Sequence, residues 1–240
     1  MISVEITLSS VMKVQLLINN KREKMKKLAF IVISLFLFGI QSAKAEMRVG
    51  VTGALHMLDA SGTETIRSSA EKNTGSHSED ALVGEIFAEA LADNGVAVGI
   101  AYIPTRDMGS KSRTDSGDQS AGTYKAEAEL DNVVQLYTDI PFYEAYGASI
   151  YAKLGVQHAT IVTLESLNSG SSYPDKDVLG VTLGLGARGD LPYGNNLFYK
   201  FDVTYTDFED YKADSDSSPA NKIEADLEDI AAKVSIGYKF

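Results

Sequence analysis

The sequence contains no cysteine, no tryptophan and only three histidines among its 240 residues. The absence of cysteine excludes disulfide bonds and thiolate metal sites, so stability must come from packing or from the hydrogen-bonded closure of a sheet. His56, His77 and His158 are too widely spaced to form a ligand pattern. The sequence therefore predicts no metal site and no cofactor.

Basic residues are also scarce. The chain has 22 Lys and Arg against 33 Asp and Glu, and residues 1–45 hold 7 of the basic and 2 of the acidic residues. Residues 46–240 therefore carry 15 basic and 31 acidic side chains, a net charge of −16. Because phosphate binding requires clustered Lys and Arg, the sequence predicts no nucleic-acid partner.

Long hydrophobic runs are limited to one segment, Leu28–Ile40, which is uncharged and follows Lys26 and Lys27. The segment Ala43-Lys44-Ala45 then has the small-x-small form of a signal-peptidase site, so cleavage is expected between Ala45 and Glu46. A membrane-anchoring helix is the alternative. The apolar run has 13 residues, however, and a spanning helix needs roughly 20.

Three segments follow from this reading. Residues 1–24 are interpreted as an upstream extension outside the fold, because Met25 directly precedes the basic start of the leader. Residues 25–45 are predicted to be the signal peptide. Residues 46–240 have a length that suits one domain.

From Glu46 onward, apolar and polar residues alternate with period 2 between breaks rich in Gly, Ser and Asp, a pattern that predicts an all-β domain. Ala81–Leu91 could also be a helix, because it is rich in Ala, Glu and Leu. Eight strands are predicted: Met47–Leu58, Ala81–Leu91, Val96–Pro104, Thr123–Thr138, Tyr146–Thr163, Val178–Arg188, Leu197–Thr206 and Ile223–Phe240.

The predicted connections alternate in length, as in an eight-stranded antiparallel up-and-down transmembrane barrel with loops on one rim and turns on the other. Both termini then lie on the rim with the short turns. The long connections are Asp59–Asp80, Thr105–Gly122, Leu164–Asp177 and Asp207–Lys222, and the short ones are Ala92–Gly95, Asp139–Ala145 and Gly189–Asn196.

Each predicted strand carries an unbroken apolar row on one face and small or charged residues on the other. In Val178–Arg188, for example, Leu183 lies in the apolar row and Gly184 in the polar one. A soluble ligand-binding barrel would turn the apolar rows inward, but eight strands enclose too little space for so many Tyr, Phe and Leu side chains. The apolar rows are therefore predicted to face lipid.

The charged side chains of the other face would then lie in the lumen, where unpaired charges are costly. A salt-bridged plug is the main interpretation, and a narrow ion path is the alternative. The predicted lumen-facing charges are Arg48, Glu85, Glu89, Lys125, Glu127, Glu129, Lys153, Arg188, Lys200, Asp202 and Lys233.

The chain ends in Val234-Ser235-Ile236-Gly237-Tyr238-Lys239-Phe240, with an apolar residue at every second position. Together with the leader and the eight strands, this segment resembles the small outer-membrane β-barrels of the OmpX and opacity-protein type. The resemblance implies that Tyr238 and Phe240 form the signal read by the barrel-assembly machinery. It also implies a location in the cell outer membrane.

These features predict a monomeric barrel with a structural or surface-interaction role. Outer-membrane lipid and lipopolysaccharide are the expected partners. A narrow porin-like channel is the alternative, and a lipid-modifying enzyme is a weaker one because the chain shows no Ser, His and acid spacing typical of catalysis. Acidic loops such as Asp207–Asp210 are expected on the cell exterior, solvated and mobile rather than built as calcium sites.

Overall fold

The computed structural model describes most of the chain after Ala45, and no helix in that described part is long and apolar enough to cross a membrane. Glu23 of the upstream extension and Lys27 of the predicted signal peptide are also described, whereas the other residues before Ala45, Ala43 included, lie outside the described residues. The described ranges are 45–67, 70–115, 122–166, 172–192, 196–216 and 220–240.

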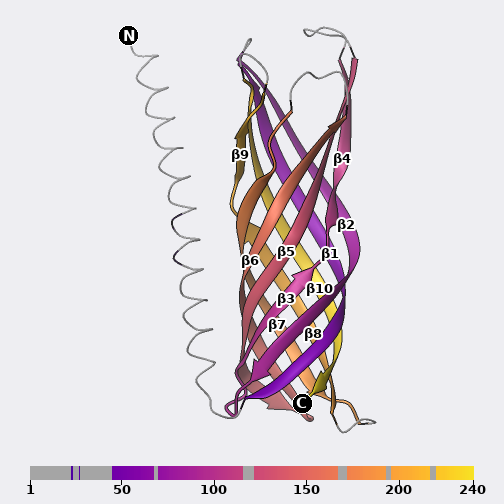
Figure 1. Cartoon of the computed structure of the whole chain (residues 1–240), viewed down its shortest axis with the longest axis vertical. Coiled ribbons are helices and arrows are strands. Elements are labelled where there is room, and N and C mark those ends of the chain that lie inside the picture. The colour runs from indigo at the N-terminus through magenta and orange to yellow at the C-terminus, as the bar shows by residue number, and fades with distance from the viewer. Residues whose placement is uncertain are drawn as a thin grey trace.

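Strands make up nearly all of these ranges, and every neighbouring pair is antiparallel (Figure 1). The strands are β1 Glu46–Ile66, β2 Glu71–Leu91, β3 Ala97–Ile103, β4 Arg106–Asp115, β5 Gly122–Ala145, β6 Ala148–Ser166, β7 Lys176–Asp190, β8 Leu197–Phe208, β9 Tyr211–Asp214 and β10 Lys222–Lys239.

The sheet closes into a barrel because β10 pairs with β1 over the full length from Arg48↔Lys239 to Thr65↔Lys222. The ten strands occupy eight positions around the ring. β3 and β4 both pair with β5 and form one position interrupted at Pro104, which has no N–H to donate. β8 and β9 both pair with β10 and form another. The predicted eight-stranded antiparallel barrel is confirmed.

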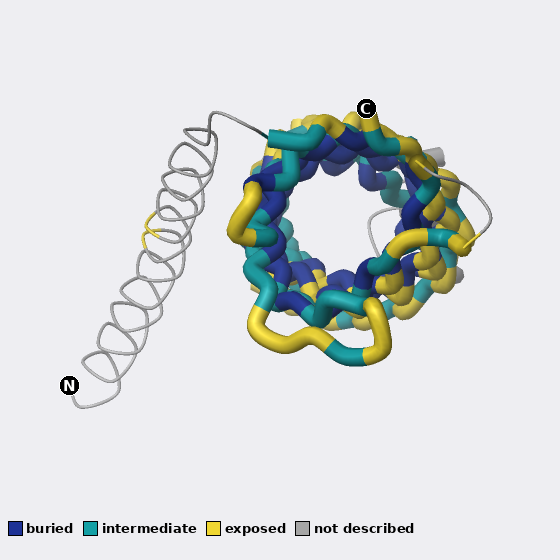
Figure 2. The backbone as a smooth tube through the Cα atoms, turned by 90° about the horizontal axis from the view of Figure 1, so that it is seen from below, coloured by how far each residue is buried: buried dark blue, intermediate teal, exposed yellow. Residues whose placement is uncertain are grey.

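Alternation along each strand sorts the side chains between the inside and the outside of the ring (Figure 2). Toward the lower rim of Figure 1, where the chain ends, the outer face is apolar: Val51 and Leu183 are 56% and 49% exposed. Their neighbours Thr52 and Thr182 are buried inside. The predicted assignment of the apolar rows to the outer face is confirmed for this lower half of the barrel.

In the upper half the alternation continues, but the polar residues now lie on the outer face and the apolar residues on the inner face. On β1 the outward positions become Asp59 and Ser61, while Leu58 and Ala60 turn inward. The buried interior is then an apolar cluster, called the upper core below. It consists of Leu58, Ile103, Met108, Leu130, Val133, Ala159, Ile161, Tyr173, Val178, Phe208, Tyr211 and Leu227.

In the upper half, strands extend into segments that were predicted to be loops. Most of Asp59–Asp80 is strand, and only a few residues around Arg67 connect β1 to β2. β4 and β9 likewise lie inside segments predicted as loops. These segments have few apolar residues, but their backbone groups are paired in the ladder, as in Ser61↔Ser76. Most of Asp59–Asp80 and of Thr105–Gly122 is therefore barrel wall.

At the lower rim, Asp139–Ala145 is strand rather than a turn, and the turn is Tyr146-Gly147, where both residues have positive φ. Ala81–Leu91 belongs to β2, so the helical alternative is wrong. Pairing with β1 overrides the helix propensity of its Ala, Glu and Leu residues.

Candidate functional site

The candidate site is the barrel interior, where charged side chains from most strands meet at the level of the lower half. Large rings fit there because they lie over glycines of neighbouring strands: a Cβ at Gly99 would clash with the ring of Tyr137, and one at Gly186 with Tyr151. Glycines in the inward rows thus make room for the aromatic side chains of neighbouring strands.

One charged layer, called the lower cluster, is centred on two lysines. The Lys200 amine lies 2.6 Å from Glu89 Oε2 and 2.8 Å from Asp139 Oδ2. The Lys153 amine lies 2.7 Å from Asp139 Oδ1 and 3.5 Å from Asp202 Oδ1. All five side chains are buried. Charges placed in a poorly hydrated space are thereby compensated.

Two tyrosines complete this layer by donating hydrogen bonds to its carboxylates. The Tyr137 hydroxyl donates to Glu89 at 2.9 Å, and the Tyr151 hydroxyl donates to Asp202 at 2.8 Å. The Lys153 amine also lies 3.8 Å from the centre of the Tyr137 ring, a cation–π distance.

Two arginines lie at the lower end of the interior. Arg48 Nε lies 2.6 Å from Glu46 Oε1, and its guanidinium stacks 4.8 Å from the ring of Phe198. Arg188 donates to the carbonyl of Gly95 and stacks 5.1 Å from the ring of Tyr151. Two guanidinium groups thus line the lower end of the interior.

A second charged layer, called the upper cluster, surrounds His56. Nε2 of His56 lies 2.9 Å from Glu85 Oε1, and Nδ1 lies 2.8 Å from Asp229 Oδ2. Arg106 Nη1 lies 2.8 Å from Asp229 Oδ2 and 2.5 Å from His56 Nδ1. The Lys233 amine binds Glu85 at 2.8 Å and 3.0 Å. Residues of four strands meet in this layer.

An uncharged patch joins the interior walls beside these clusters. The Gln157 amide donates to the hydroxyls of Thr182 and Thr206, both at 3.1 Å, and Gln135 donates to Thr182 at 3.2 Å. Above the upper cluster, the upper core fills the interior with apolar side chains.

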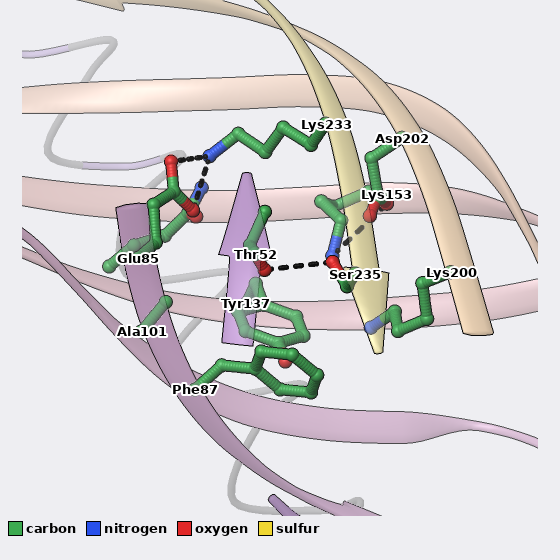
Figure 3. Close-up of a pocket in the computed structure, with 11 residues that line it drawn as sticks. Thr52, Glu85, Phe87, Ala101, Tyr137, Lys153, Lys200, Asp202, Lys233 and Ser235 are labelled. Carbon is green, nitrogen blue, oxygen red and sulfur yellow. Dashed lines mark hydrogen bonds and ion pairs between the residues drawn. The ribbon is translucent and has the colours of Figure 1, made fainter. Parts of the chain in front are cut away.

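Little space remains between the two clusters. A cavity of about 20 Å³ lies there, bordered by Lys233 and Glu85 on one side and by Lys200 and Asp202 on the other (Figure 3). That volume accommodates about one or two water molecules. Among the described residues, no group of three His, Cys, Asp or Glu side chains could hold a metal ion.

The structure brings most of the predicted lumen charges together inside the barrel. The buried ones are Arg48, Glu85, Glu89, Lys153, Arg188, Lys200, Asp202 and Lys233.

The prediction that Glu127 and Glu129 face the lumen is wrong. Leu130, next to Glu129, is fully buried in the upper core, so both glutamates lie in the outward row. The cause is a bulge between Asp131 and Val134, where Asn132 has φ 51° and the alternation of β5 shifts by one residue. Lys125 lies at a strand position of the same parity, and its side chain falls outside the described residues.

Four important interior residues escaped the sequence analysis: His56, Arg106, Asp139 and Asp229. Asp139 and Arg106 fell in segments predicted to be connections. Asp229 and His56 could have been found, because Asp229 shares the parity of Lys233 and His56 shares that of Arg48.

The residues predicted for assembly lie at the closing strand. Tyr238 and Phe240 are 44% and 74% exposed, and their rings contact each other at 5.1 Å. The Phe240 N–H donates to the Met47 carbonyl at 2.9 Å, which brings the chain end to the start of the barrel. Glu46, predicted to follow the cleavage site, is the first residue of β1.

At the upper rim, one carboxyl has a pKa shifted by its contacts. Asp216 accepts hydrogen bonds from the backbone N–H of Ser172 at 2.8 Å and from its hydroxyl at 2.7 Å. These bonds favour the charged carboxylate and lower the pKa of Asp216 below its ordinary value. They join the segment before β7 to the segment after β9.

The closed ring of eight strand positions and the apolar outer belt define the class: this is an outer-membrane β-barrel fold. No protein-family model and no curated protein matches the sequence. Among solved structures, the outer membrane protein OprG from Pseudomonas aeruginosa superposes with a TM-score of 0.59 at 18% identity, over 83% of this chain and 98% of that one.

Two other solved barrels are similar with lower TM-scores. Ail, the attachment invasion locus protein of Yersinia pestis, has a TM-score of 0.38 at 12% identity, over 80% of this chain and 99% of that one. The outer membrane protease OmpT from Escherichia coli has a TM-score of 0.44 at 8% identity, over 83% and 99%. A fold alone does not specify a function, so the function must be argued from the interior and the surface of this barrel.

Proposed function

We propose that the chain is a monomeric, integral outer-membrane protein with a closed lumen and a structural or surface-interaction role, and that it is not an enzyme. The observation that carries this proposal is the filled interior of the described barrel, in which the two charged clusters border a water-sized cavity of about 20 Å³ and the upper core packs above them. A solute path would have to displace buried ion pairs and an apolar core, which is costly.

Conductance tests the closed lumen directly. The refolded protein, inserted in a planar lipid bilayer at neutral pH, is expected to give no single-channel steps. Insertion is verified in parallel by the protection of its strands from protease. Regular current steps from inserted protein would contradict the closed-lumen proposal.

A narrow channel is the second candidate, favoured by the polar cavity lined by Lys153, Lys200 and Lys233. If ions pass, the three amines of the cavity outnumber its two carboxylates, Glu85 and Asp202, and this excess favours anions. The same bilayer experiment with a KCl gradient would then give a reversal potential of the sign set by chloride, and Lys200→Met would reduce that selectivity.

The surface role rests on the outer face of the upper half. On β1 the polar row from Asp59 to Thr65 continues the strand beyond the apolar belt, and β2 and β10 extend beside it. At about 3.4 Å per residue and a tilt of about 40°, the nine residues from Leu58 to Ile66 rise by about 20 Å. The upper rim is thereby held away from the lipid.

Topology can be tested with protease on intact cells. Arg67 is exposed at the upper rim, and Tyr146 is exposed at the lower rim. Trypsin is expected to cut after Arg67 in intact cells, and chymotrypsin is expected to cut after Tyr146 only when the outer membrane is permeabilised. The reverse pattern would place the upper rim in the periplasm.

Export and assembly belong to the same proposal. Residues 25–45 act as the signal peptide, so N-terminal sequencing of the mature protein is expected to start at Glu46. Deletion of Phe240 is expected to slow insertion by the barrel-assembly machinery while export continues. Outer-membrane levels equal to those of the complete chain would contradict a signal at Phe240.

Contact with lipopolysaccharide is proposed at the outer face just above the apolar belt. Asp59, Glu228 and Asp207 are cross-strand neighbours there. These carboxylates and the anionic lipid carry charge of the same sign and repel each other. Divalent cations bound between them reduce that repulsion. Binding of the refolded protein to lipopolysaccharide vesicles is therefore expected to fall when EDTA is added and to recover with excess Mg²⁺.

A further inference from the structure

One stretch of the barrel wall lacks a backbone ladder. β3 pairs with β2 from Ile86↔Tyr102 to Leu91↔Ala97, but β4 pairs with β5 alone. Within the described residues, the part of β2 from Glu71 to Glu85 has a backbone ladder with β1 alone. We call the boundary between this part of β2 and β4 the seam.

The upper cluster lies at the base of this seam. Arg106 is the first residue of β4, and its side chain is fully buried. It binds Asp229 of β10 and His56 of β1, while His56 binds Glu85 of β2. A chain of side chains thus joins β4 to the wall at the height where backbone pairing with β2 stops.

The contact of His56 with Arg106 fits the neutral form of the ring. Nδ1 lies 2.5 Å from Arg106 Nη1 and 2.8 Å from Asp229 Oδ2. Because a guanidinium has only donors, Nδ1 is the acceptor of the Arg106 contact, Arg106 Nη1 bridges Nδ1 and Asp229, and the proton on Nε2 donates to Glu85. The charged groups facing His56 are Glu85 on β2, Asp229 and Lys233 on β10, and Arg106 on β4. Two carboxylates and two cations balance when the imidazole is neutral.

We propose that the seam is a pH-sensitive closure, held shut by neutral His56 and released when His56 is protonated. A proton on Nδ1 removes the acceptor of Arg106 and places two cations in contact inside a buried site. Nδ1–H then donates to Asp229, which competes with Arg106 for the same carboxylate oxygen. Arg106 is displaced, and β4 loses its connection to β1 and β10.

A second histidine, His77, lies farther along the seam. The test must distinguish protonation of His56 from protonation of His77. His77 of β2 contacts Glu79 at 3.2 Å, and a Cβ at Gly109 of β4 would clash with its ring. The test therefore uses a chain carrying His77→Gln and His158→Gln, in which His56 is the only histidine.

Because the chain has no cysteine, spin labels can be attached at chosen sites. Ser76→Cys on β2 and Ser110→Cys on β4 place exposed labels on either side of the seam. The matched control is Ser61→Cys with Asp226→Cys, which are ladder partners on β1 and β10. Electron paramagnetic resonance then measures the dipolar interaction in each refolded, doubly labelled barrel.

Acidification from about pH 8 to about pH 5, the range in which histidine ordinarily titrates, is expected to reduce the dipolar interaction across the seam and leave the control pair unchanged. His56→Gln is expected to abolish the response, because the glutamine amide can donate to Glu85 and accept from Arg106 but takes up no proton. An unchanged interaction across the seam, a stronger one at acid pH, or a response that persists in His56→Gln would overturn the proposal.

A second measurement does not depend on folding of the His56→Gln variant. Nitrogen NMR of labelled histidine in the chain with His56 alone reports which ring nitrogen is protonated. At about pH 8 we expect the neutral form with the proton on Nε2. A proton on Nδ1 at that pH would overturn the proposal, because Arg106 would then have no acceptor on the ring.

Discussion

The lower and upper halves of the barrel are built by the same strands with the same alternation, yet their inner and outer faces have opposite chemistry. In the lower half, Val51 faces outward and Lys200 faces inward; in the upper half, Ser61 faces outward and Leu130 faces inward. The lower half needs lipid around it, and the upper half resembles a small water-soluble barrel with its own core. Height along the strand, and not strand identity, sets the environment of each face.

The largest expected effect is the loss of a cation from the lower interior. Lys200→Met leaves Glu89 without its closest amine and Asp139 with Lys153 alone, and breaking a buried pair in this way costs about 3–5 kcal/mol. Lys222→Met, at an exposed position of the upper half, is expected to stay within about 0.5 kcal/mol. Urea titration of the refolded barrels in vesicles measures both. Similar costs would mean that the lower cluster is hydrated.

The upper core is expected to respond as the core of a soluble protein does. Leu130→Ala, at a fully buried position, should destabilise the barrel by about 2–5 kcal/mol because it leaves a cavity. Leu185→Ala removes the same atoms from the lipid-facing row, where Leu185 is 60% exposed. Lipid can fill that space, so the loss should be smaller. Equal losses in the same titration would argue against a packed upper core.

The outer faces can be compared with one substitution. Leu183→Arg, in the middle of the apolar row of β7, should cost about 2–4 kcal/mol if the lower half spans the bilayer. Ser61→Arg, on the outer face of the upper half, should change stability by no more than about 0.5 kcal/mol. A refolding titration that gives both variants the same stability would show that the belt does not meet lipid at Leu183.

The smallest effect concerns the upper rim. Ser172→Ala removes the hydroxyl donor to Asp216 and keeps the backbone donor, so the pKa of Asp216 should rise part of the way to its ordinary value. Because the folded pKa is lowered, these bonds stabilise the rim above the ordinary aspartate pKa, and the contribution is lost as pH falls through the folded value. Carboxyl NMR titration measures the change, and an unaltered pKa would mean that the hydroxyl contributes nothing.

Alternation alone was sufficient to predict the barrel, its antiparallel order and the lipid-facing rows of the lower half. It also identified eight of the buried charges, among them Glu89 and Lys200, because each lies opposite an apolar row in its own strand. The prediction failed where alternation is broken. At Asn132 an extra residue shifts β5, and Glu127 and Glu129 change sides.

The sequence by itself determined that the chain forms a closed all-β barrel with one apolar face, because a period of two is a local property of each strand. Only the tertiary structure decided how far the strands continue, since polar segments such as Asp59–Thr65 are held as strand by partners about 160 residues away in the chain. It also decided that His56, Arg106 and Asp229 meet. Which inward side chains touch depends on the register between strands, and register is set by closure of the whole ring.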